Sequence, residues 1–230
     1  MIHKTLGVIG GLGVQTSQLF CTNVVKKVRD TTKIQPSILC HTVNLSLVLE
    51  SDLVYSRPSK EHLSVLLDSI KLLESAGVSK IAIPCNTVHI FIEEMRASSK
   101  VPILSIIDET AQRMAAEGFG KVGLLASSTS INAGLYQREL SKHRIGALVP
   151  TKDEQKMISD LIFKILNGTN FSADLTRVIQ VIENLENHGA EAFILGCTDL
   201  RLINLPSNVP MIDSTSVLED VAIRYLVDLN

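Results

Sequence analysis

Residues 76–87 read AGVSKIAIPCNT, and residues 188–199 read HGAEAFILGCTD. In each stretch, a glycine that suits a turn is followed by a short apolar run typical of a buried strand, and then by a cysteine with small polar neighbours. The glycine and the cysteine keep the same separation in both stretches, which end in Cys85-Asn86-Thr87 and Cys197-Thr198-Asp199. The chain therefore contains one βα pattern twice.

Two further landmarks repeat in the same order. Gly7-Val8-Ile9-Gly10-Gly11 opens a helix near the start of the chain, and Gly123-Leu124-Leu125-Ala126-Ser127 opens one at the start of the second half. A Val-Pro pair then leads a short strand after each cysteine, at Val101-Pro102 and at Val209-Pro210. A duplicated α/β unit predicts two similar lobes related by a pseudo-twofold axis, with a cleft where the carboxyl ends of the strands meet.

Short apolar runs alternate with stretches of helical periodicity, which is typical of βα units around a mostly parallel sheet. One helical stripe runs from Leu63 to Leu73, and Gly77 suits its C-terminal cap. We expect an α/β fold of two similar lobes, each a mostly parallel sheet flanked by helices. The expected strands are Leu6–Ile9, Ser37–His41, Ile81–Pro84, Ile103–Ile106, Val122–Ala126, Ala147–Pro150, Ala192–Leu195 and Met211–Asp213.

The repeat also predicts how the chain divides. We expect residues 1–100 together with the C-terminal residues 214–230 in the first lobe, and residues 101–213 in the second. A helix expected from Ser216 to Leu229 then packs back on the first lobe. The alternative is a single doubly wound sheet, in which the repeat only reflects turn chemistry that βα units share.

Composition excludes several classes of protein. Of the 230 residues, 45% are hydrophobic and 20% are charged, so the chain is neither disordered nor fibrous. A net charge of −2 without a basic stripe argues against a nucleic-acid partner. No apolar run approaches membrane-spanning length, and Met1–Thr5 lacks the features of a signal peptide, so we expect a cytoplasmic protein with no membrane partner. Its four cysteines should be reduced thiols.

Cys85 and Cys197 each follow the end of an expected strand, where α/β proteins place ligands. A pseudo-twofold axis would bring the two thiols face to face across the cleft. Inverting a stereocentre by proton transfer needs a base on one face of the carbon and an acid on the other, and two identical groups can exchange these roles. Cys21 and Cys40 carry no functional claim, because free cysteines often only fill space.

The same segments offer groups that serve such chemistry. A thiol has an unperturbed pKa of about 8.5, so the site must lower the pKa of the attacking cysteine. Asn86, Thr87 and Thr198 are short polar residues at expected helix starts, suited to holding a substrate carboxylate. Asn86 and Thr198 can also serve as N-caps. Cys85 and His89 have the spacing of metal ligands, but no second pair completes a zinc site, so we expect no metal.

These motifs resemble those of the aspartate/glutamate racemase family, and the resemblance spans nearly the whole chain. It implies a racemase that needs neither PLP nor metal, has no cofactor, forms a homodimer and acts on an amino acid. Cys85 and Cys197 would be its catalytic acid/base pair, and Leu12, Asn86, Thr87, Ser130 and Thr198 would line the substrate site. The resemblance rests on Pro84-Cys85-Asn86-Thr87-Val88-His89, Leu195-Gly196-Cys197-Thr198-Asp199, Gly10-Gly11-Leu12-Gly13 and Leu124-Leu125-Ala126-Ser127.

Two departures concern the substrate side chain. Aspartate-specific members of the family commonly carry an Arg that binds the side-chain carboxylate, but residues 49–53 contain none and the nearest is Arg57. Leu166 stands where a Lys is usual; Lys164 is the nearest substitute, although on a helix it points about 200° away. We expect Asp52 and Lys164 to contact the substrate. Asp52 would repel a second carboxylate and favour a neutral or basic substrate.

Three alternatives stay open. Gly10, Gly11 and Gly13 after a strand suggest a dinucleotide-binding loop, but Thr16 replaces the third glycine of that motif. A hydantoin racemase, a maleate isomerase or an arylmalonate decarboxylase would share the two-lobed scaffold and one or both cysteines, although two intact cysteines favour a two-base racemase. The third alternative is a non-catalytic protein that binds an amino acid in the cleft.

Overall fold

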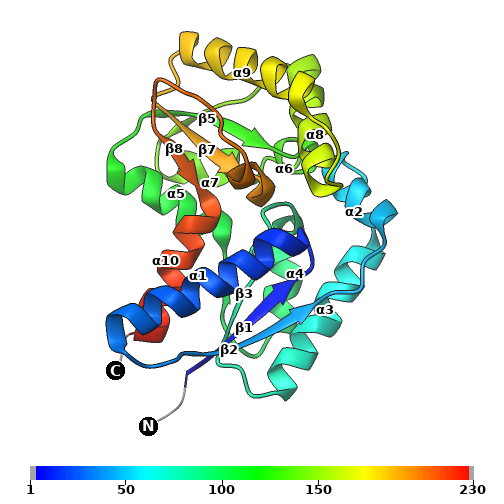
Figure 1. Cartoon of the computed structure of the whole chain (residues 1–230), viewed down its shortest axis with the longest axis vertical. Coiled ribbons are helices and arrows are strands. Elements are labelled where there is room, and N and C mark those ends of the chain that lie inside the picture. The colour runs from blue at the N-terminus through cyan, green and yellow to red at the C-terminus, as the bar shows by residue number, and fades with distance from the viewer. Residues whose placement is uncertain (1–3, 228–230) are drawn as a thin grey trace.

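The computed structural model describes residues 4–227 and consists of two lobes, one above the other in Figure 1. Each lobe has a four-stranded parallel sheet, ordered β2-β1-β3-β4 in the first lobe and β6-β5-β7-β8 in the second. The two orders are equivalent, with the first strand of each half lying second in its sheet. The predicted duplication is confirmed, and the alternative of a single doubly wound sheet is wrong.

Helices separate the strands in both lobes. The first half contains β1 (Thr5–Gly10), α1 (Val14–Thr32), β2 (Ser37–Thr42), α2 (Leu47–Val54), α3 (Lys60–Ser75), β3 (Lys80–Ala82), the 3-10 helix η1 (Thr87–Phe91), α4 (Ile92–Ser98) and β4 (Ile103–Leu104). The rest contains α5 (Ile106–Glu117), β5 (Lys121–Ala126), α6 (Ser128–Asn132), α7 (Leu135–Lys142), β6 (Gly146–Leu148), α8 (Lys152–Leu166), α9 (Ser172–Asn187), β7 (Ala192–Gly196), the 3-10 helix η2 (Thr198–Leu202), β8 (Met211–Asp213) and α10 (Ser214–Val227). Within residues 4–227, no helix is both long and apolar enough to cross a membrane.

All eight strands expected from the sequence are present, and the differences lie at their ends. β3 stops at Ala82, earlier than expected, because Pro84 has no N–H with which to continue the ladder. The chain turns there, and the N–H of Cys85 donates to the carbonyl of Ile83 at 2.8 Å. Because of this turn, Cys85 lies beyond the end of β3, where it lines the cavity between the lobes.

β4 changes the expected division of the chain. Ile103 pairs with Ile81 of β3, and Leu104 follows in the same register, so β4 belongs to the first sheet. The boundary expected after residue 100 therefore moves beyond Leu104. The strand ends there because the side chain of Ser105 accepts a hydrogen bond from the first turn of α5 and caps that helix.

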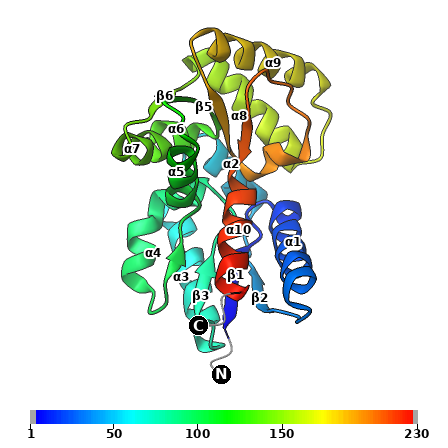
Figure 2. The same ribbon diagram turned by 90° about the vertical axis from the view of Figure 1, so that its left-hand side faces the viewer.

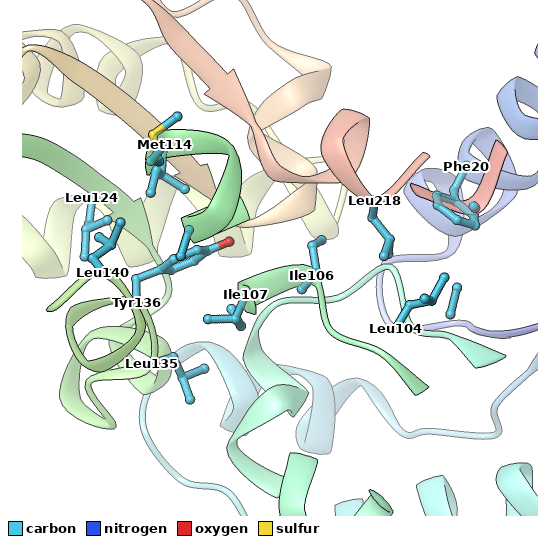
Figure 3. Close-up of a cluster of buried hydrophobic side chains, with 14 of the residues drawn as sticks. Phe20, Leu104, Ile106, Ile107, Met114, Leu124, Leu135, Tyr136, Leu140 and Leu218 are labelled. Atoms are coloured by element: carbon cyan, nitrogen blue, oxygen red, sulfur yellow. The ribbon is translucent and has the colours of Figure 1, made fainter. Parts of the chain in front are cut away.

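The last helix joins the lobes. α10 leaves β8 of the second sheet and packs against α1 and α5 (Figures 1 and 2). The C-terminal helix thus contacts the first lobe, as predicted; it begins at Ser214, and Leu229 lies outside the described residues. Phe20 of α1, Ile106 of α5 and Leu218 of α10 belong to one buried cluster that reaches both sheets (Figure 3). Burial of apolar surface, at roughly 25 cal/mol per Å², therefore holds the two lobes together.

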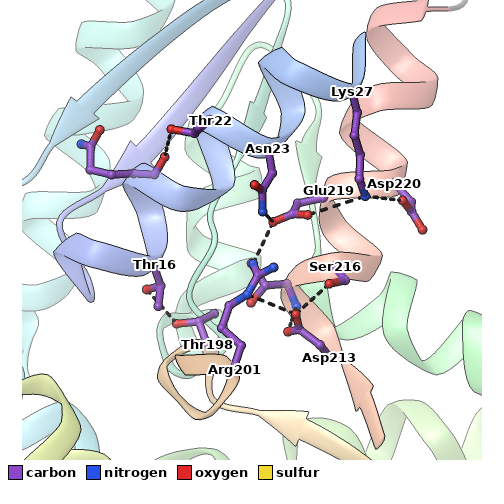
Figure 4. A network of polar contacts seen from close by, with 12 residues as sticks. Thr16, Thr22, Asn23, Lys27, Thr198, Arg201, Asp213, Ser216, Glu219 and Asp220 are labelled. Atoms are coloured by element: carbon purple, nitrogen blue, oxygen red, sulfur yellow. Dashed lines mark hydrogen bonds and ion pairs between the residues drawn. The ribbon is translucent and has the colours of Figure 1, made fainter. Parts of the chain in front are cut away.

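A buried polar network fixes the segment after the second cysteine (Figure 4). Arg201 of η2 donates to Glu219 of α10 at 2.7 Å and lies 3.2 Å from a carboxylate oxygen of Asp213. Asn23 of α1 donates to the same Glu219 oxygen at 2.9 Å. The Glu219 side chain is only 2% exposed, so its charge depends on these partners. The network therefore anchors η2 to α1 and α10.

Candidate active site

A cavity opens between the two lobes at the carboxyl ends of their strands. It encloses about 390 Å³ of empty space, counting its open mouth. Both Cys85 and Cys197 line it, which is the arrangement expected from the duplicated pattern. The other lining residues are Leu12, Gly13, Glu50, Leu53, Val54, Asn86, Thr87, Ser127, Ile162, Leu166, Thr198 and Asp199.

Cys85 is partly buried at the start of η1. Loss of water raises the pKa of its thiol to about 12, and the backbone N–H groups of Val88 and Thr87 act in the opposite direction by hydrogen bonding to the sulfur. The negative charge of Asp199 raises the pKa further. Cys85 is therefore a neutral thiol near neutral pH, with donors already in position to stabilise a thiolate.

Cys197 is buried at the start of η2, and its sulfur lies 3.7 Å from a carboxylate oxygen of Asp199. Burial and the charge of Asp199 raise the pKa of this thiol well above its ordinary value. A negative charge on Cys85 also raises the pKa of Cys197, so the two thiols interact electrostatically across the cavity. Both cysteines are thus neutral thiols near neutral pH, and a charge on one makes ionisation of the other less favourable.

Asp199 is the most strongly shifted carboxyl group in the cavity. Burial raises its pKa to about 7, and the charge of Glu50 adds to the increase. Hydrogen bonds from Cys197 and Thr16 act against these effects. A carboxyl group that titrates near neutral pH, beside a thiol, is able to exchange a proton with it.

Hydroxyl groups connect the two lobes at matching places. Thr87 of the first lobe lies 2.8 Å from Ser127 of the second, measured between hydroxyl oxygens. Thr198 of the second lobe lies 3.4 Å from Thr16 of the first (Figure 4). Each cysteine loop therefore contacts the opening turn of the opposite lobe, and the pseudo-twofold relation extends to the walls of the site.

Gly13 permits the lobes to approach this closely. Its φ is +86°, a region that L side chains rarely adopt. A Cβ atom there would lie 2.8 Å from the Thr16 hydroxyl and 3.0 Å from a carboxylate oxygen of Asp199. Its N–H donates to Glu50 at 3.2 Å, which brings a second carboxylate to the cavity.

Asn86 lines the cavity, but its side chain is not an N-cap. Its carbonyl oxygen accepts from the Tyr136 hydroxyl at 2.5 Å, and its amide donates to Ser214 at 3.0 Å. Both partners belong to elements that follow the first sheet, so they hold the amide rigidly between the lobes. The N-cap of η2 is Cys197, and Thr198 is the first residue of that helix, so the N-cap interpretation is wrong for Thr198 as well.

Three residues expected at the site lie elsewhere. Asp52 pairs with Arg57 at 3.5 Å and does not line the cavity. The ammonium group of Lys164 lies 2.5 Å from Asp174 of α9, and Lys164 does not line the cavity. Ser130 is buried behind Ser127, which it contacts at 3.0 Å between hydroxyls, and it also lies outside the lining.

His89 contacts both the Cys85 loop and the start of α5. Its Nδ1 lies 2.8 Å from the carbonyl of Cys85, and the backbone N–H of Ile106 donates to its Nε2 at 3.3 Å. Burial lowers the pKa of its imidazole to about 4. Both ring nitrogens are therefore occupied, and the neutral ring braces the Cys85 loop against α5.

The sequence interpretation missed most of the cavity wall that α2 and α8 form. Glu50, Leu53 and Val54 come from one face of α2, and Ile162 and Leu166 from one face of α8. Their spacings of three and four residues are helical, so the pattern indicates two amphipathic helices. It does not indicate that these two faces meet across the cavity.

The charge of the cavity is one-sided. Within residues 4–227, its lining contains the acidic residues Glu50 and Asp199 but no Lys, Arg or His. Arg57, the Arg nearest to residues 49–53, is paired with Asp52 outside the cavity, and Lys164, the nearest substitute for the family's Lys, is paired with Asp174. Loss of water also raises the pKa of Glu50 above its ordinary value.

Comparisons with known proteins agree with this geometry. Residues 9–221 match the Asp/Glu/hydantoin racemase family. The chain is 31% identical over 156 residues to the broad specificity amino-acid racemase RacX of Bacillus subtilis, covering 66% of this chain and 67% of that protein. Among solved structures, an aspartate racemase homologue from Pyrococcus horikoshii has a TM-score of 0.77 at 25% identity, covering 98% of this chain and all 100% of that one. The Picrophilus torridus aspartate racemase has a TM-score of 0.80 at 24% identity, covering 97% and 94% of the two chains.

The chain therefore belongs to the Asp/Glu/hydantoin racemase family, and the resemblance drawn from its two cysteine motifs is confirmed. The expected enzyme class, an isomerase of the racemase type, is confirmed with it. The two-lobed α/β fold is likewise that of the solved Picrophilus torridus aspartate racemase and of the Pyrococcus horikoshii homologue.

Proposed function

We propose that this protein is an amino-acid racemase that inverts the α-carbon with two thiols and without a cofactor. The observation that carries the proposal is that Cys85 and Cys197 line one cavity from equivalent positions of two equivalent lobes. A planar carbanion formed between them would be accessible to a proton from either side. Two identical groups suit a reaction whose substrate and product are mirror images.

The proposed reaction moves two protons. A thiolate removes the α-proton from one face of the substrate, the electron pair stays on the carbon, and the opposite thiol gives its proton to the other face. The result is the inverted amino acid, with one thiol and one thiolate exchanged. Solvent exchange and a proton shift between the two sulfurs restore the starting state. In the reverse direction, Cys85 and Cys197 exchange roles.

The raised pKa values of both thiols require a way to form the thiolate. The positive α-ammonium group of a bound amino acid favours the ionised form of a thiol nearby. The N–H groups of Thr87 and Val88 favour it at Cys85. At Cys197, the adjacent Asp199 has a pKa of about 7 and can accept the proton of the thiol.

Polar groups in the lining suit the substrate carboxylate. Thr87 and Ser127 offer hydroxyls from one side of the cavity, and Thr198 offers one from the other. The amide of Asn86 has a second hydrogen besides the one donated to Ser214.

The named relatives leave the substrate class open. The Bacillus subtilis relative is called a broad specificity amino-acid racemase, which supports a substrate range beyond aspartate and glutamate. The family description also includes hydantoin racemase, and a cavity without basic residues favours a neutral hydantoin as a second candidate. The homodimer and the cytoplasmic location stay predictions from the sequence.

Solvent deuterium exchange tests the proposal. The purified protein, without added PLP or metal, is incubated in D2O with a panel of L- and D-amino acids and a 5-substituted hydantoin, and deuterium at the α-carbon is followed by proton NMR. We expect exchange with inversion for at least one amino acid, and a loss of about 10²- to 10⁴-fold in Cys85→Ser and in Cys197→Ser. Cys21→Ser, at a thiol outside the cavity, is the matched control. Inversion that survives either active-site substitution would contradict the two-thiol mechanism, and exchange of the hydantoin alone would favour the second candidate.

A further inference from the structure

Two thiols outside the cavity contact each other in the first lobe. Cys21 belongs to α1 and Cys40 to β2, and both pack against the same buried cluster. Figure 2 shows α1 beside β2. The Cys21 thiol donates a hydrogen bond to the sulfur of Cys40. Neither residue lines the cavity between the lobes, so the proposed racemisation does not use this pair.

The surroundings of Gly10 place the two thiols together independently. A Cβ atom at Gly10 would lie 3.1 Å from the Cys40 sulfur and 3.1 Å from the Ser17 hydroxyl oxygen, so β2 and α1 meet at this point. Cys21 comes four residues after Ser17 and shares its face of the helix. Cys40 pairs with Val8 in the parallel ladder and lies on the sheet face that α1 covers. The two thiols therefore face each other across the contact between α1 and β2.

Cys40 is the more reactive thiol of the pair. The hydrogen bond from Cys21 lowers the pKa of Cys40 below its ordinary value, whereas that hydrogen bond and burial raise the pKa of Cys21. At Cys85 and Cys197, burial raises the pKa instead. Peroxides oxidise thiolates in preference to thiols. Both Cys21 and Cys40 are partly exposed, so a small oxidant can reach them from solvent.

We propose that Cys21 and Cys40 form a peroxide-sensitive pair that oxidation converts into a disulfide. The Cys40 thiolate attacks hydrogen peroxide, so that a sulfur–oxygen bond forms, the oxygen–oxygen bond breaks and hydroxide leaves. This step oxidises Cys40 to a sulfenic acid and reduces the peroxide. The Cys21 sulfur then attacks the Cys40 sulfur, and the sulfenic oxygen leaves as water with the proton of Cys21. In total, two thiols and one peroxide give one disulfide and two water molecules.

The pair is connected to the cavity through the first turn of α1. The Ser17 hydroxyl accepts from the N–H of Gly11 at 3.1 Å and donates to the carbonyl of Gly13 at 3.0 Å. A bond between Cys21 and Cys40 would draw α1 toward β2 and move Ser17 with it. Because Gly13 lines the cavity, we expect the disulfide to distort the site and slow the reaction. This consequence rests on the proposed function, whereas formation of the disulfide does not.

Peptide mass spectrometry tests the pair without any assay of activity. The reduced protein is treated with equimolar hydrogen peroxide, the remaining thiols are alkylated, and the chain is cleaved with trypsin. Each cysteine lies in a different tryptic peptide, so every possible linkage can be identified. We expect a disulfide between the peptides of residues 5–26 and 34–60, which contain Cys21 and Cys40.

Substitutions assign the two roles. In Cys21→Ser, peroxide should leave a sulfenic acid on Cys40, which dimedone traps for detection by mass. In Cys40→Ser, Cys21 should remain a thiol. The double variant Cys85→Ser/Cys197→Ser lacks both cavity thiols and is the matched control. It should form the linkage as readily as the wild type.

Racemase activity shows whether the pair acts on the cavity. Peroxide treatment should lower wild-type kcat/KM by about 10- to 100-fold, as expected when a site is displaced by up to about 1 Å, and dithiothreitol should restore it. Cys40→Ser changes a residue outside the lining and should keep its activity after the same treatment. A linkage that forms without loss of activity would contradict the connection to Gly13.

Three results would overturn the inference. Oxidation of Cys85 or Cys197 before Cys40 would mean that the cavity thiols are the targets of peroxide. A sulfinic acid on Cys40 beside an unmodified Cys21 would mean that Cys21 does not resolve the intermediate. Equal inactivation of the wild type and Cys40→Ser would assign the loss of activity to the cavity. A linked protein that never exchanges the α-proton of any amino acid would support the redox pair and reject the proposed function.

Discussion

A carboxylate oxygen of Asp199 lies 3.7 Å from the thiol sulfur of Cys197. The two residues are separated only by Thr198 at the start of η2, and both line the cavity between the lobes. Cys85 has no carboxylate at the equivalent place in its own loop, where Thr87 stands instead. The site is therefore symmetric in its thiols but asymmetric in the groups that assist them.

This asymmetry predicts a pH-dependent role for Asp199. Because its pKa is raised to about 7, the carboxylate that accepts the Cys197 proton is lost as the pH falls below 7. We expect wild-type kcat to decline on that side, and Asp199→Asn to lower kcat by about 10- to 100-fold and to remove that limb. The pH–rate profiles in both reaction directions measure this effect. An unchanged acidic limb in the variant would assign the titration to another group.

The same pKa predicts how stability depends on pH. Between the ordinary value of 3.8 and about 7, the folded protein holds a proton on Asp199 that the unfolded chain has released, so stability falls as the pH rises through this window. Asp199→Asn removes that loss and should gain roughly 1–3 kcal/mol over the wild type between pH 4 and pH 8. Thermal melts at both pH values, with the exposed Asp68→Asn as control, measure the difference. A gain that is the same at pH 4 and pH 8 would contradict the prediction.

Gly13 should be needed for catalysis rather than for folding alone. In Gly13→Ala, the new methyl group would meet Thr16 and Asp199 and push the lobes apart, since contacts of 2.8 and 3.0 Å are too short for a Cβ atom. Displacements of this size cost about 10²-fold in rate, so we expect a loss of that order in kcat/KM. Gly77→Ala is the matched control, because Gly77 also has a positive φ but no atom within 4 Å of the added Cβ. It should lose about 1 kcal/mol of stability and keep its activity. Equal losses of activity in the two variants would show that backbone strain, not crowding, is responsible.

The network around Arg201 should contribute strongly to stability. Arg201→Met leaves the charge of buried Glu219 without its main partner, which typically costs about 3–5 kcal/mol. For a chain of this size, we expect the Tm to fall by roughly 6–20 °C. Lys71→Met breaks an exposed pair with Asp68 and should change the free energy of unfolding by about 0–1 kcal/mol. Urea titrations of both variants test this difference. Similar midpoints for the two variants would show that the network contributes little.

The local patterns in the sequence predicted the strands and the cysteine loops because these depend on neighbouring residues. Short apolar runs predicted all eight strands, and the glycine before each cysteine together with the Val-Pro pair after it predicted the doubling of the lobe. The exact ends depended on local chemistry, such as the missing N–H of Pro84. The location of Cys85 and Cys197 in one cavity then followed from the equivalence of the lobes.

The cavity wall formed by α2 and α8 was harder to predict because it depends on which faces of these two helices meet. Asp52 was expected at the site, but Glu50 lines it; two residues apart on a helix, their side chains point about 200° away from each other. The same holds for Lys164 and Leu166 on α8. The residues predicted for the site were within two positions of the residues that line it. Which side of each helix faces the cavity depends on how the two lobes pack, and the sequence does not contain this information directly.

The central claim is that two thiols act on opposite faces of one carbon, and the isotope content of the recovered substrate tests it most directly. A single enantiomer of the best amino-acid substrate is incubated with the protein in D2O and stopped at low conversion, and the two enantiomers are separated and analysed by mass spectrometry. The account predicts deuterium in the product enantiomer and protium in the recovered substrate, since the proton added comes from a second, solvent-equilibrated thiol. Equal deuterium in both enantiomers would mean that one base serves both faces, and it would contradict the assignment of Cys85 and Cys197 as an opposed pair.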